Sequence, residues 1–174
     1  MSAPIIPARY EWTVVSPAGV NDRRQLGNNS TTPSNLPVNV PSLDGVVQIG
    51  PGSSHTCVVV GEVNRVACWG ANDRGQAGRP MSPTVGAPVL VDAGSLQFIE
   101  VHGGDAHTCA LATDKTLWCW GKDDSGQLGN GTTTSETPEV PVQVLTAESE
   151  PLENVEQFML GANHACALLE NDQI

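Results

Sequence analysis

Cysteine and histidine are the residue types in this chain whose spacing could do chemistry. The five cysteines form two close pairs and one single residue: Cys57 with Cys68, Cys109 with Cys119, and Cys166. A histidine stands two positions before the first cysteine of each group, at His55, His107 and His164. Two kinds of site could use this pattern, namely disulfide bonds and metal centres.

The local pattern favours disulfides. Residues 107–121 predict a β-hairpin, because two apolar runs flank a polar tip at 113–115. If Asp114 is the centre of the turn, Cys109 lies opposite Cys119, and the same pairing holds for the two cysteines within 55–70. Opposed residues of an antiparallel pair are close enough for a bridge, and the alternative is a pair of reduced core cysteines. Cys166 is expected to be unpaired, because the second strand of its hairpin would extend beyond residue 174.

A metal centre is not expected. A single His-x-Cys is not a zinc spacing, and ligands on successive repeats would lie too far apart to share one ion. We expect each histidine to be structural, at the entrance of a strand and bonded to the backbone. The sequence contains no phosphate-binding loop, no nucleophile elbow and no zinc-protease motif. We therefore predict neither a catalytic residue nor a cofactor, and expect that the chain is not an enzyme.

The elements that would position these residues are short strands in a repeated unit. Gly27, Gly78 and Gly129 follow one another at intervals of 51 residues, each at the end of a glycine-rich loop. A regular interval of this size is typical of a propeller or a solenoid. Both faces of each predicted hairpin are apolar, so each sheet must be covered on both sides, as stacked blades are. The sequence predicts an all-β partial propeller of about three blades, each a small antiparallel sheet.

The repeats suggest a division of the chain into five segments. These are a tail or linker at 1–9, a partial blade at 10–35, repeats at 36–86 and 87–139, and a truncated repeat at 140–174.

Composition limits the partners and the compartment. The net charge is −11 and the chain has only 8 Lys and Arg, which argues against nucleic acid as a partner. No run of 18 apolar residues occurs, so no membrane span is predicted. Residues 1–12 do not resemble a secretory signal. Paired cysteines nevertheless favour an extracellular or cell-surface location, with the cytoplasm as the alternative.

The text G-x-x-H-T-C-A-L followed by C-W-G and G-Q-L-G resembles the repeats of the regulator of chromosome condensation family. The residues that carry this motif are His55, Trp69, Gly70, Gly78, His107, Trp120, Gly121, Gly129 and His164. The resemblance implies a β-propeller of about seven four-stranded blades. Two positions depart from it, since Arg24 stands where glycine is usual and Ala77 replaces leucine. The cysteine-bearing version is most similar to bacterial members, which are often secreted or on the cell surface.

These observations predict a non-enzymatic protein-binding or scaffold module that uses the loops at one end of its blades. The chain is expected to be a fragment of a larger cell-surface or secreted protein, with further blades closing the ring. A homo-oligomer, in which the strand near Trp12 completes the hairpin at His164 of another copy, is the alternative. For function, the alternative implied by the resemblance is guanine-nucleotide exchange on a small GTPase.

Overall fold

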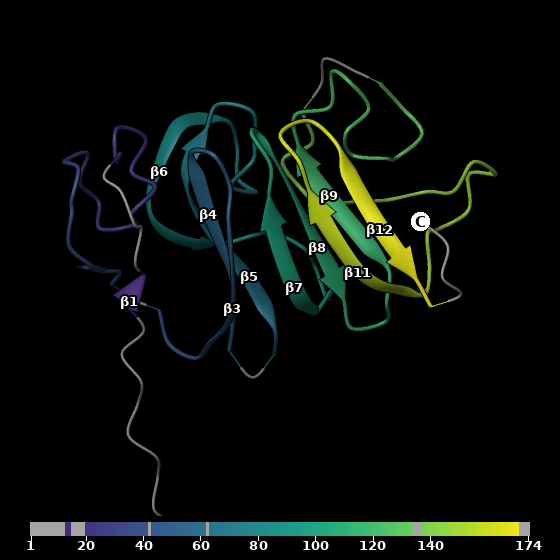
Figure 1. Ribbon diagram of the computed structural model, residues 1–174, viewed down its shortest axis with the longest axis horizontal. Helices are drawn as coiled ribbons and strands as arrows, with labels where there is room; N and C mark the ends of the chain where they lie inside the picture. Colours follow the sequence, from purple (N-terminus) through teal and green to yellow (C-terminus); the bar gives the residue numbers. More distant parts are fainter. Residues whose placement is uncertain (1–12, 15–19, 42, 62, 134–136, 171–174) are drawn as a thin grey trace, which may run out of the picture.

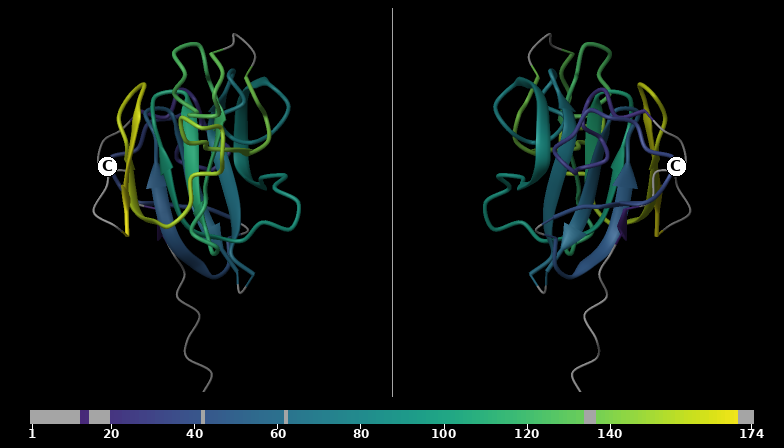
Figure 2. Two further views of the ribbon diagram at one scale, coloured as in Figure 1. Left: turned by 90° about the vertical axis from the view of Figure 1, so that its right-hand side faces the viewer. Right: turned by 90° about the vertical axis from the view of Figure 1, so that its left-hand side faces the viewer.

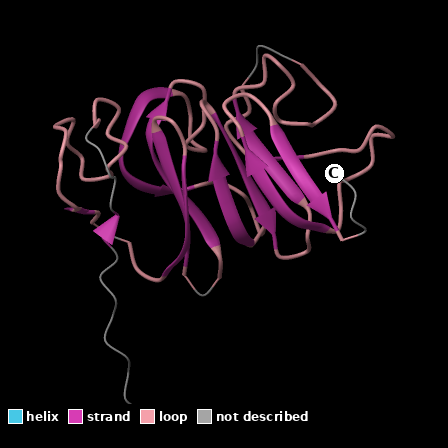
Figure 3. Cartoon of the chain, in the orientation of Figure 1, coloured by secondary structure: helices cyan, strands magenta, loops and turns pink. Residues whose placement is uncertain are grey.

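The structure is a computed structural model, and it describes residues 13–14, 20–41, 43–61, 63–133 and 137–170. Throughout these ranges the chain is strand and loop, without helix (Figure 3). The strands are β1 (Thr13–Val14), β2 (Val38–Asn39), β3 (Val46–Pro51), β4 (His55–Val60), β5 (Arg65–Asn72), β6 (Ser82–Leu90), β7 (Phe98–Gly103), β8 (His107–Ala112), β9 (Leu117–Gly121), β10 (Val142–Gln143), β11 (Val155–Leu160) and β12 (Ala165–Leu169). The predicted all-β class is confirmed.

The strands form two complete antiparallel sheets of four with a two-stranded sheet on either side (Figure 1). The first blade has the order β3-β4-β5-β6, and the second has the order β7-β8-β9-β10. Strands β1 and β2 form an N-terminal half-blade, and β11 and β12 form a C-terminal half-blade. The sheets therefore follow one another in chain order, as the blades of a propeller do.

The hairpin between the second and third strands of each blade has the register that the sequence predicts. Cys57 lies opposite Cys68, Cys109 opposite Cys119, and Leu111 opposite Leu117. The tip of the second hairpin turns at Lys115, whose φ is +66°. Strand alternation then places the paired cysteines of each blade on one face and the tryptophan that follows on the other.

These two faces build the cores between the blades. The cysteine face of the first blade packs against Ala110 and Trp120 of the second. The cysteine face of the second packs against Phe158 and Ala167 of the C-terminal half-blade. The opposite face of the first blade, which includes Trp69, packs against Val40. Each complete sheet is thus covered on both sides, as its apolar faces require.

The first strands of successive blades approach one another through their backbones. A Cβ atom added at Gly103 would lie 2.6 Å from the Cα of Gly52, so this contact requires glycine. Close by, the Ser53 N–H donates to the Gly104 carbonyl at 3.0 Å, and the Asp105 N–H donates to the Ala162 carbonyl at 3.0 Å. The same bond therefore joins the first blade to the second and the second to the half-blade. Figure 2 views the stack from its two ends.

Candidate protein-binding face

Three glycine loops, at 21–29, 72–80 and 123–131, lie at the same end of the blades as the turns that connect the first and second strands. A buried side chain fixes the start of each loop. The Oδ1 atoms of Asn21 and Asn72 accept a hydrogen bond from the backbone N–H five residues later, both at 3.0 Å. Asp123 does the same at 3.2 Å. All three side chains have 0% exposure, so each loop is attached to the blade from inside.

A second side chain closes the turn in the middle of each loop. The Oε1 atom of Gln76 accepts the N–H of Arg74 at 2.8 Å, and Gln25 and Gln127 make the equivalent bond. Gly75 has a φ of +72°, and Arg24 adopts a φ of +62° at the equivalent position. The loop therefore keeps its shape where arginine replaces glycine, although the left-handed conformation is unfavourable for a residue with a side chain. The side chain of Arg74 remains exposed.

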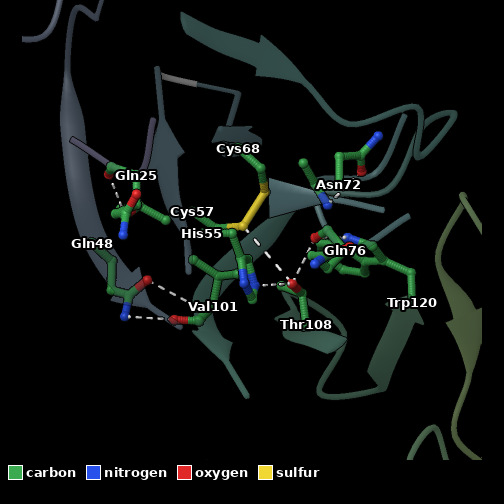
Figure 4. The surroundings of a disulfide bond; sticks show 12 residues. Gln25, Gln48, His55, Cys57, Cys68, Asn72, Gln76, Val101, Thr108 and Trp120 are labelled. Atoms are coloured by element: carbon green, nitrogen blue, oxygen red, sulfur yellow. Dashed lines mark hydrogen bonds between the residues drawn. A yellow bond between two sulfur atoms is a disulfide. The ribbon is translucent and has the colours of Figure 1, made fainter. Parts of the chain in front are cut away.

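A polar network inside the stack connects the loop at 72–80 to the following blade. The Thr108 hydroxyl of β8 donates to the carbonyl of Gln76 at 2.8 Å, and the indole N–H of Trp120 donates to the same carbonyl at 3.0 Å. His55 of the preceding blade completes the network through its Nε2 atom, 2.8 Å from the Thr108 hydroxyl oxygen. Figure 4 shows these side chains beside the disulfide of Cys57 and Cys68. Since Thr108 donates its one hydrogen to Gln76, His55 must donate through Nε2.

The network recurs at the first interface and is incomplete at the third. Thr56 and Trp69 donate to the carbonyl of Gln25 at 3.0 and 2.8 Å. At the third interface the position equivalent to the threonine is Ala165, which has no hydroxyl. The two ring nitrogens of buried His107 have no hydrogen-bond partner among the described residues. The interface between the second blade and the half-blade therefore lacks polar contacts that the other two interfaces have.

Burial controls the protonation of both histidines. Burial, with a smaller contribution from neighbouring His107, lowers the pKa of His55 from 6.5 to about 4. Burial also lowers the pKa of His107 to about 4, partly opposed by the carboxylate of Asp105. Both imidazoles are consequently neutral at pH 7. At that pH neutral His55 links the first blade to the second through Thr108.

On the outer side, the loops present charged side chains around a polar pocket of about 250 Å³. The charged residues that line it are Arg23, Asp73, Arg74, Asp105 and Lys122. Arg23 and Asp73 come from successive loops and approach to 4.0 Å as a solvent-exposed ion pair. The chain is acidic overall, yet three of its 8 cationic side chains gather here. This end of the blades can therefore offer both signs of charge to a partner.

The cysteines are positioned as disulfides in two blades. Cys57 is bonded to Cys68 with a Cα–Cα distance of 4.1 Å, and Cys109 to Cys119 with 4.0 Å. All four are buried, whereas Cys166 is a free thiol and exposed. Among the described residues, no group of three or more His, Cys, Asp or Glu side chains is arranged to hold a metal ion. In the same part of the chain, no helix has the length and apolar character needed to cross a bilayer.

The repeat-motif residues lie where they support the blades. Trp69 and Trp120 have 0% exposure, and Gly70 and Gly121 adopt left-handed φ values of +103° and +98°. Gly78 and Gly129 close their loops with φ values of +67° and +61°. His55 and His107 are buried, whereas His164, immediately before β12, is exposed.

One expectation for the histidines was wrong. The Nε2 atom of His55 bonds to a threonine hydroxyl of the next blade rather than to the backbone. Sequence reasoning also missed the role of Thr56 and Thr108 as inter-blade donors. The available signal was the repetition of threonine directly after the histidine in two copies and its replacement by Ala165 in the third.

Four-stranded antiparallel sheets, stacked by the same contacts at a fixed sequence interval, define a repeat protein of the β-propeller class. The model of the regulator of chromosome condensation (RCC1) repeat matches residues 18–59 and 114–168. A second model of this repeat matches residues 46–76 and 98–127. The chain belongs to the RCC1 repeat family.

Several relatives illustrate the match. The mitochondrial RCC1 domain-containing protein RUG3 of Arabidopsis thaliana is 30% identical over 156 residues, which cover 87% of this chain and 35% of that protein. The mouse Regulator of chromosome condensation is 35% identical over 116 residues, which cover 64% of this chain and 27% of that protein. The chain thus spans about a third of the length of such relatives.

Solved structures show the same fold. Human WBSCR16 superposes with a TM-score of 0.71 at 22% identity, over 86% of this chain and 38% of that one. Yeast RCC1 (Prp20), in its complex with Kap60, superposes with a TM-score of 0.70 at 18% identity, over 87% and 36% respectively. The described sheets therefore correspond to part of a β-propeller.

Proposed function

We propose that this chain is a non-enzymatic protein-binding module, in which the blades hold the glycine loops as a preformed recognition surface. The observation that carries the proposal is the contrast within each loop. The inner side chains, such as Asn72, are buried and hydrogen-bonded to the loop backbone, while Arg74 between them is exposed. A loop fixed in this way loses little conformational entropy on binding, which favours affinity.

Solved structures of this fold favour a protein, rather than another kind of ligand, as the partner of this chain. The yeast relative is seen in complex with Kap60, and a second study of it concerns its binding to Gsp1p and histones. The mixed charges around Arg23, Asp73 and Arg74 suit a polar protein surface. A polyanion such as nucleic acid would be repelled by a chain with net charge −11.

The proposal includes an extracellular or cell-surface location and further blades in a larger propeller. Two buried disulfides support the oxidising location, because such bonds persist outside the cytosol. The share of its relatives that the chain covers supports additional blades. Nucleotide exchange on a small GTPase is the alternative function, which the membership of the RCC1 repeat family suggests. That activity would require a reduced, intracellular protein.

Charge reversal at the loop end tests the binding role. The immobilised chain is used to isolate proteins from the culture medium of the source organism, and each captured protein is purified and titrated against variants. Arg74→Glu should weaken binding of a true partner by at least about tenfold, because close charge pairs across an interface are coupled by about 1.5 kcal/mol or more. The control reverses Lys115 at the hairpin tip of the second blade; because Lys115 is ion-paired with Glu170, Lys115→Glu is combined with Glu170→Gln, which prevents repulsion between two carboxylates. Equal affinities for the two variants would contradict the proposal.

A further inference from the structure

The polar pocket at the loop end lies between successive repeats and does not involve the C-terminal half-blade. Its walls come from the glycine loop at 21–29, from the end of β5 with the loop at 72–80, and from the turn before β8 with Lys122 after β9. Arg23 and Arg74 occupy the same position of successive loops, and both line it. With a volume of about 250 Å³, the pocket has room for one side chain and not for a folded element.

One buried side chain, Gln76, holds the charged residues of the middle loop in place. Its Oε1 atom accepts the backbone N–H of Arg74 at 2.8 Å, and its Nε2 atom donates to Oδ1 of Asp73 at 3.1 Å. The other carboxylate oxygen of Asp73 lies 4.0 Å from Arg23. The pocket is therefore built before a ligand arrives, which lowers the entropic cost of binding.

One cation of the pocket is available to a ligand. The Nζ atom of Lys122 lies 3.3 Å from a carboxylate oxygen of Asp124. Among the residues that the structure describes, Arg74 and Asp105 make no ion pair. A guanidinium can bind a carboxylate through two parallel hydrogen bonds. Half-buried Ser54, which also lines the pocket, has a hydroxyl that can donate a further bond.

The balance of charge selects an acidic side chain. Three cationic side chains line the pocket against two carboxylates, and Asp73 is already held by Gln76 and Arg23. An inserted glutamate would meet the three cations and one free carboxylate, Asp105. An inserted lysine would be repelled by the same three cations. The net charge of −11 disfavours a polyanion, so the ligand is a single carboxylate group.

We propose that this pocket binds the carboxylate of one glutamate or aspartate on the surface of the partner protein, with Arg74 as its principal contact. The proposal rests on the protein-binding function above and names the chemistry that the pocket selects. Arg23 can also turn to the ligand, because its exposed contact with Asp73 contributes little. Asp105 opposes the charge of the ligand, so its removal should strengthen binding.

The test titrates the isotope-labelled 174-residue chain with three peptides and follows its backbone amide NMR signals. The peptides have the sequence Gly-Gly-X-Gly-Gly with blocked ends, where X is glutamate, glutamine or lysine and carries any charge. The glutamate peptide should shift the signals of Arg74, Asp105 and Lys122 to saturation, with a dissociation constant in the millimolar range expected of so small a ligand. The other two peptides should bind at least about fivefold more weakly, which is the effect of losing one partly exposed ion pair.

Three variants locate the site. Arg74→Gln should weaken binding of the glutamate peptide by about fivefold. Lys115→Gln is the matched control and should leave it unchanged, because it removes the same charge at the hairpin tip, at the other end of the second blade. Asp105→Asn removes the opposing carboxylate and should strengthen binding, a result that loss of folding could not produce.

Equal shifts with the glutamate and glutamine peptides, tighter binding of the lysine peptide, or weaker binding after Asp105→Asn would overturn the proposal. Two results separate it from the protein-binding role. A captured partner that depends on Arg74, together with a glutamate peptide that does not bind, would reject the carboxylate site and keep that role. A glutamate peptide that binds, while no captured protein depends on Arg74, would support the site and reject the role.

Discussion

The histidine that begins the second strand of the first blade acts through a single uncharged proton donor. His55 donates through Nε2 to Thr108, and Nδ1 has no partner among the described residues. Adding a second proton would place a charge in a fully buried site. This explains why the imidazole is suited to a structural link at neutral pH and not to acid conditions.

The first prediction concerns acid stability. The folded-state pKa values of His55 and His107 are about 4, below the unfolded value of 6.5. Their contribution is therefore complete above pH 6.5 and is lost as the pH falls towards 4, because the unfolded chain binds protons first. Between pH 7 and pH 5 each histidine should lower the free energy of unfolding by roughly 2 kcal/mol.

Urea unfolding at pH 7 and pH 5 measures this loss. His55→Gln keeps an N–H donor for Thr108 but does not titrate, so the variant should lose roughly 2 kcal/mol less than the natural chain over this interval. The titration of carboxylates changes the free energy of unfolding of both proteins by the same amount, so it cancels in the comparison. The same pH dependence in both proteins would show that His55 is charged in the folded state.

The second prediction restores the missing hydroxyl of the third interface. Ala165→Thr places a hydroxyl at the position equivalent to Thr108, between the unpartnered Nε2 of His107 and the carbonyl of Gln127. We expect a gain of about 1 kcal/mol in the free energy of unfolding relative to Ala165→Val, which has the same shape without the hydroxyl. Urea unfolding of the two variants provides the measurement. Equal stabilities would mean that the half-blade does not reproduce the network.

At the scale of the elements, local patterns predicted the hairpins and could not predict their partners. The register of Cys109 with Cys119 follows from the position of a short turn, which the sequence marks with Thr113, Asp114 and Lys115. The hydrogen bond from Trp120 to Gln76 joins residues that are 44 positions apart, and its acceptor is the backbone carbonyl of Gln76. A tryptophan and a glutamine in the sequence do not reveal such a contact, because every residue has a backbone carbonyl. The outermost strand of the second blade was equally hidden, since β10 has only two residues.

The third prediction concerns the two disulfides. They close segments with sequence separations of 11 and 10 residues, so each should contribute about 2–3 kcal/mol by restricting the unfolded chain. Reductant should therefore lower the free energy of unfolding by roughly twice that amount in urea experiments.

Thiol counting in denaturant provides the check on redox state. The natural chain should show one thiol without reductant and five with it, and Cys166→Ser should show none and four. Five thiols in the unreduced chain would contradict the disulfides and would favour the intracellular alternative.

At the scale of the whole molecule, stability depends on contacts between neighbouring blades. Each complete sheet has two apolar faces, and neither could stay folded with one of them in water. The polar network repeats this dependence, because every bond in it joins one blade or loop to the next. Loosening one interface should therefore affect the sheets on both of its sides, as expected for a linear array of repeats.

The fourth prediction tests this coupling with a matched pair of tryptophans in β9. Trp120→Phe removes the indole N–H that bonds to the Gln76 carbonyl of the preceding loop. Trp118→Phe removes a bond of similar length, 2.8 Å, to Thr116 within the same hairpin. Both variants should be destabilised by about 1 kcal/mol. Hydrogen exchange should separate them. Trp120→Phe should speed exchange in both β5 and β8, whereas Trp118→Phe, which keeps a ring against the inter-blade core and loses a bond within the hairpin, should act mainly on the second hairpin. Faster exchange confined to the second blade in both variants would show that the blades unfold independently.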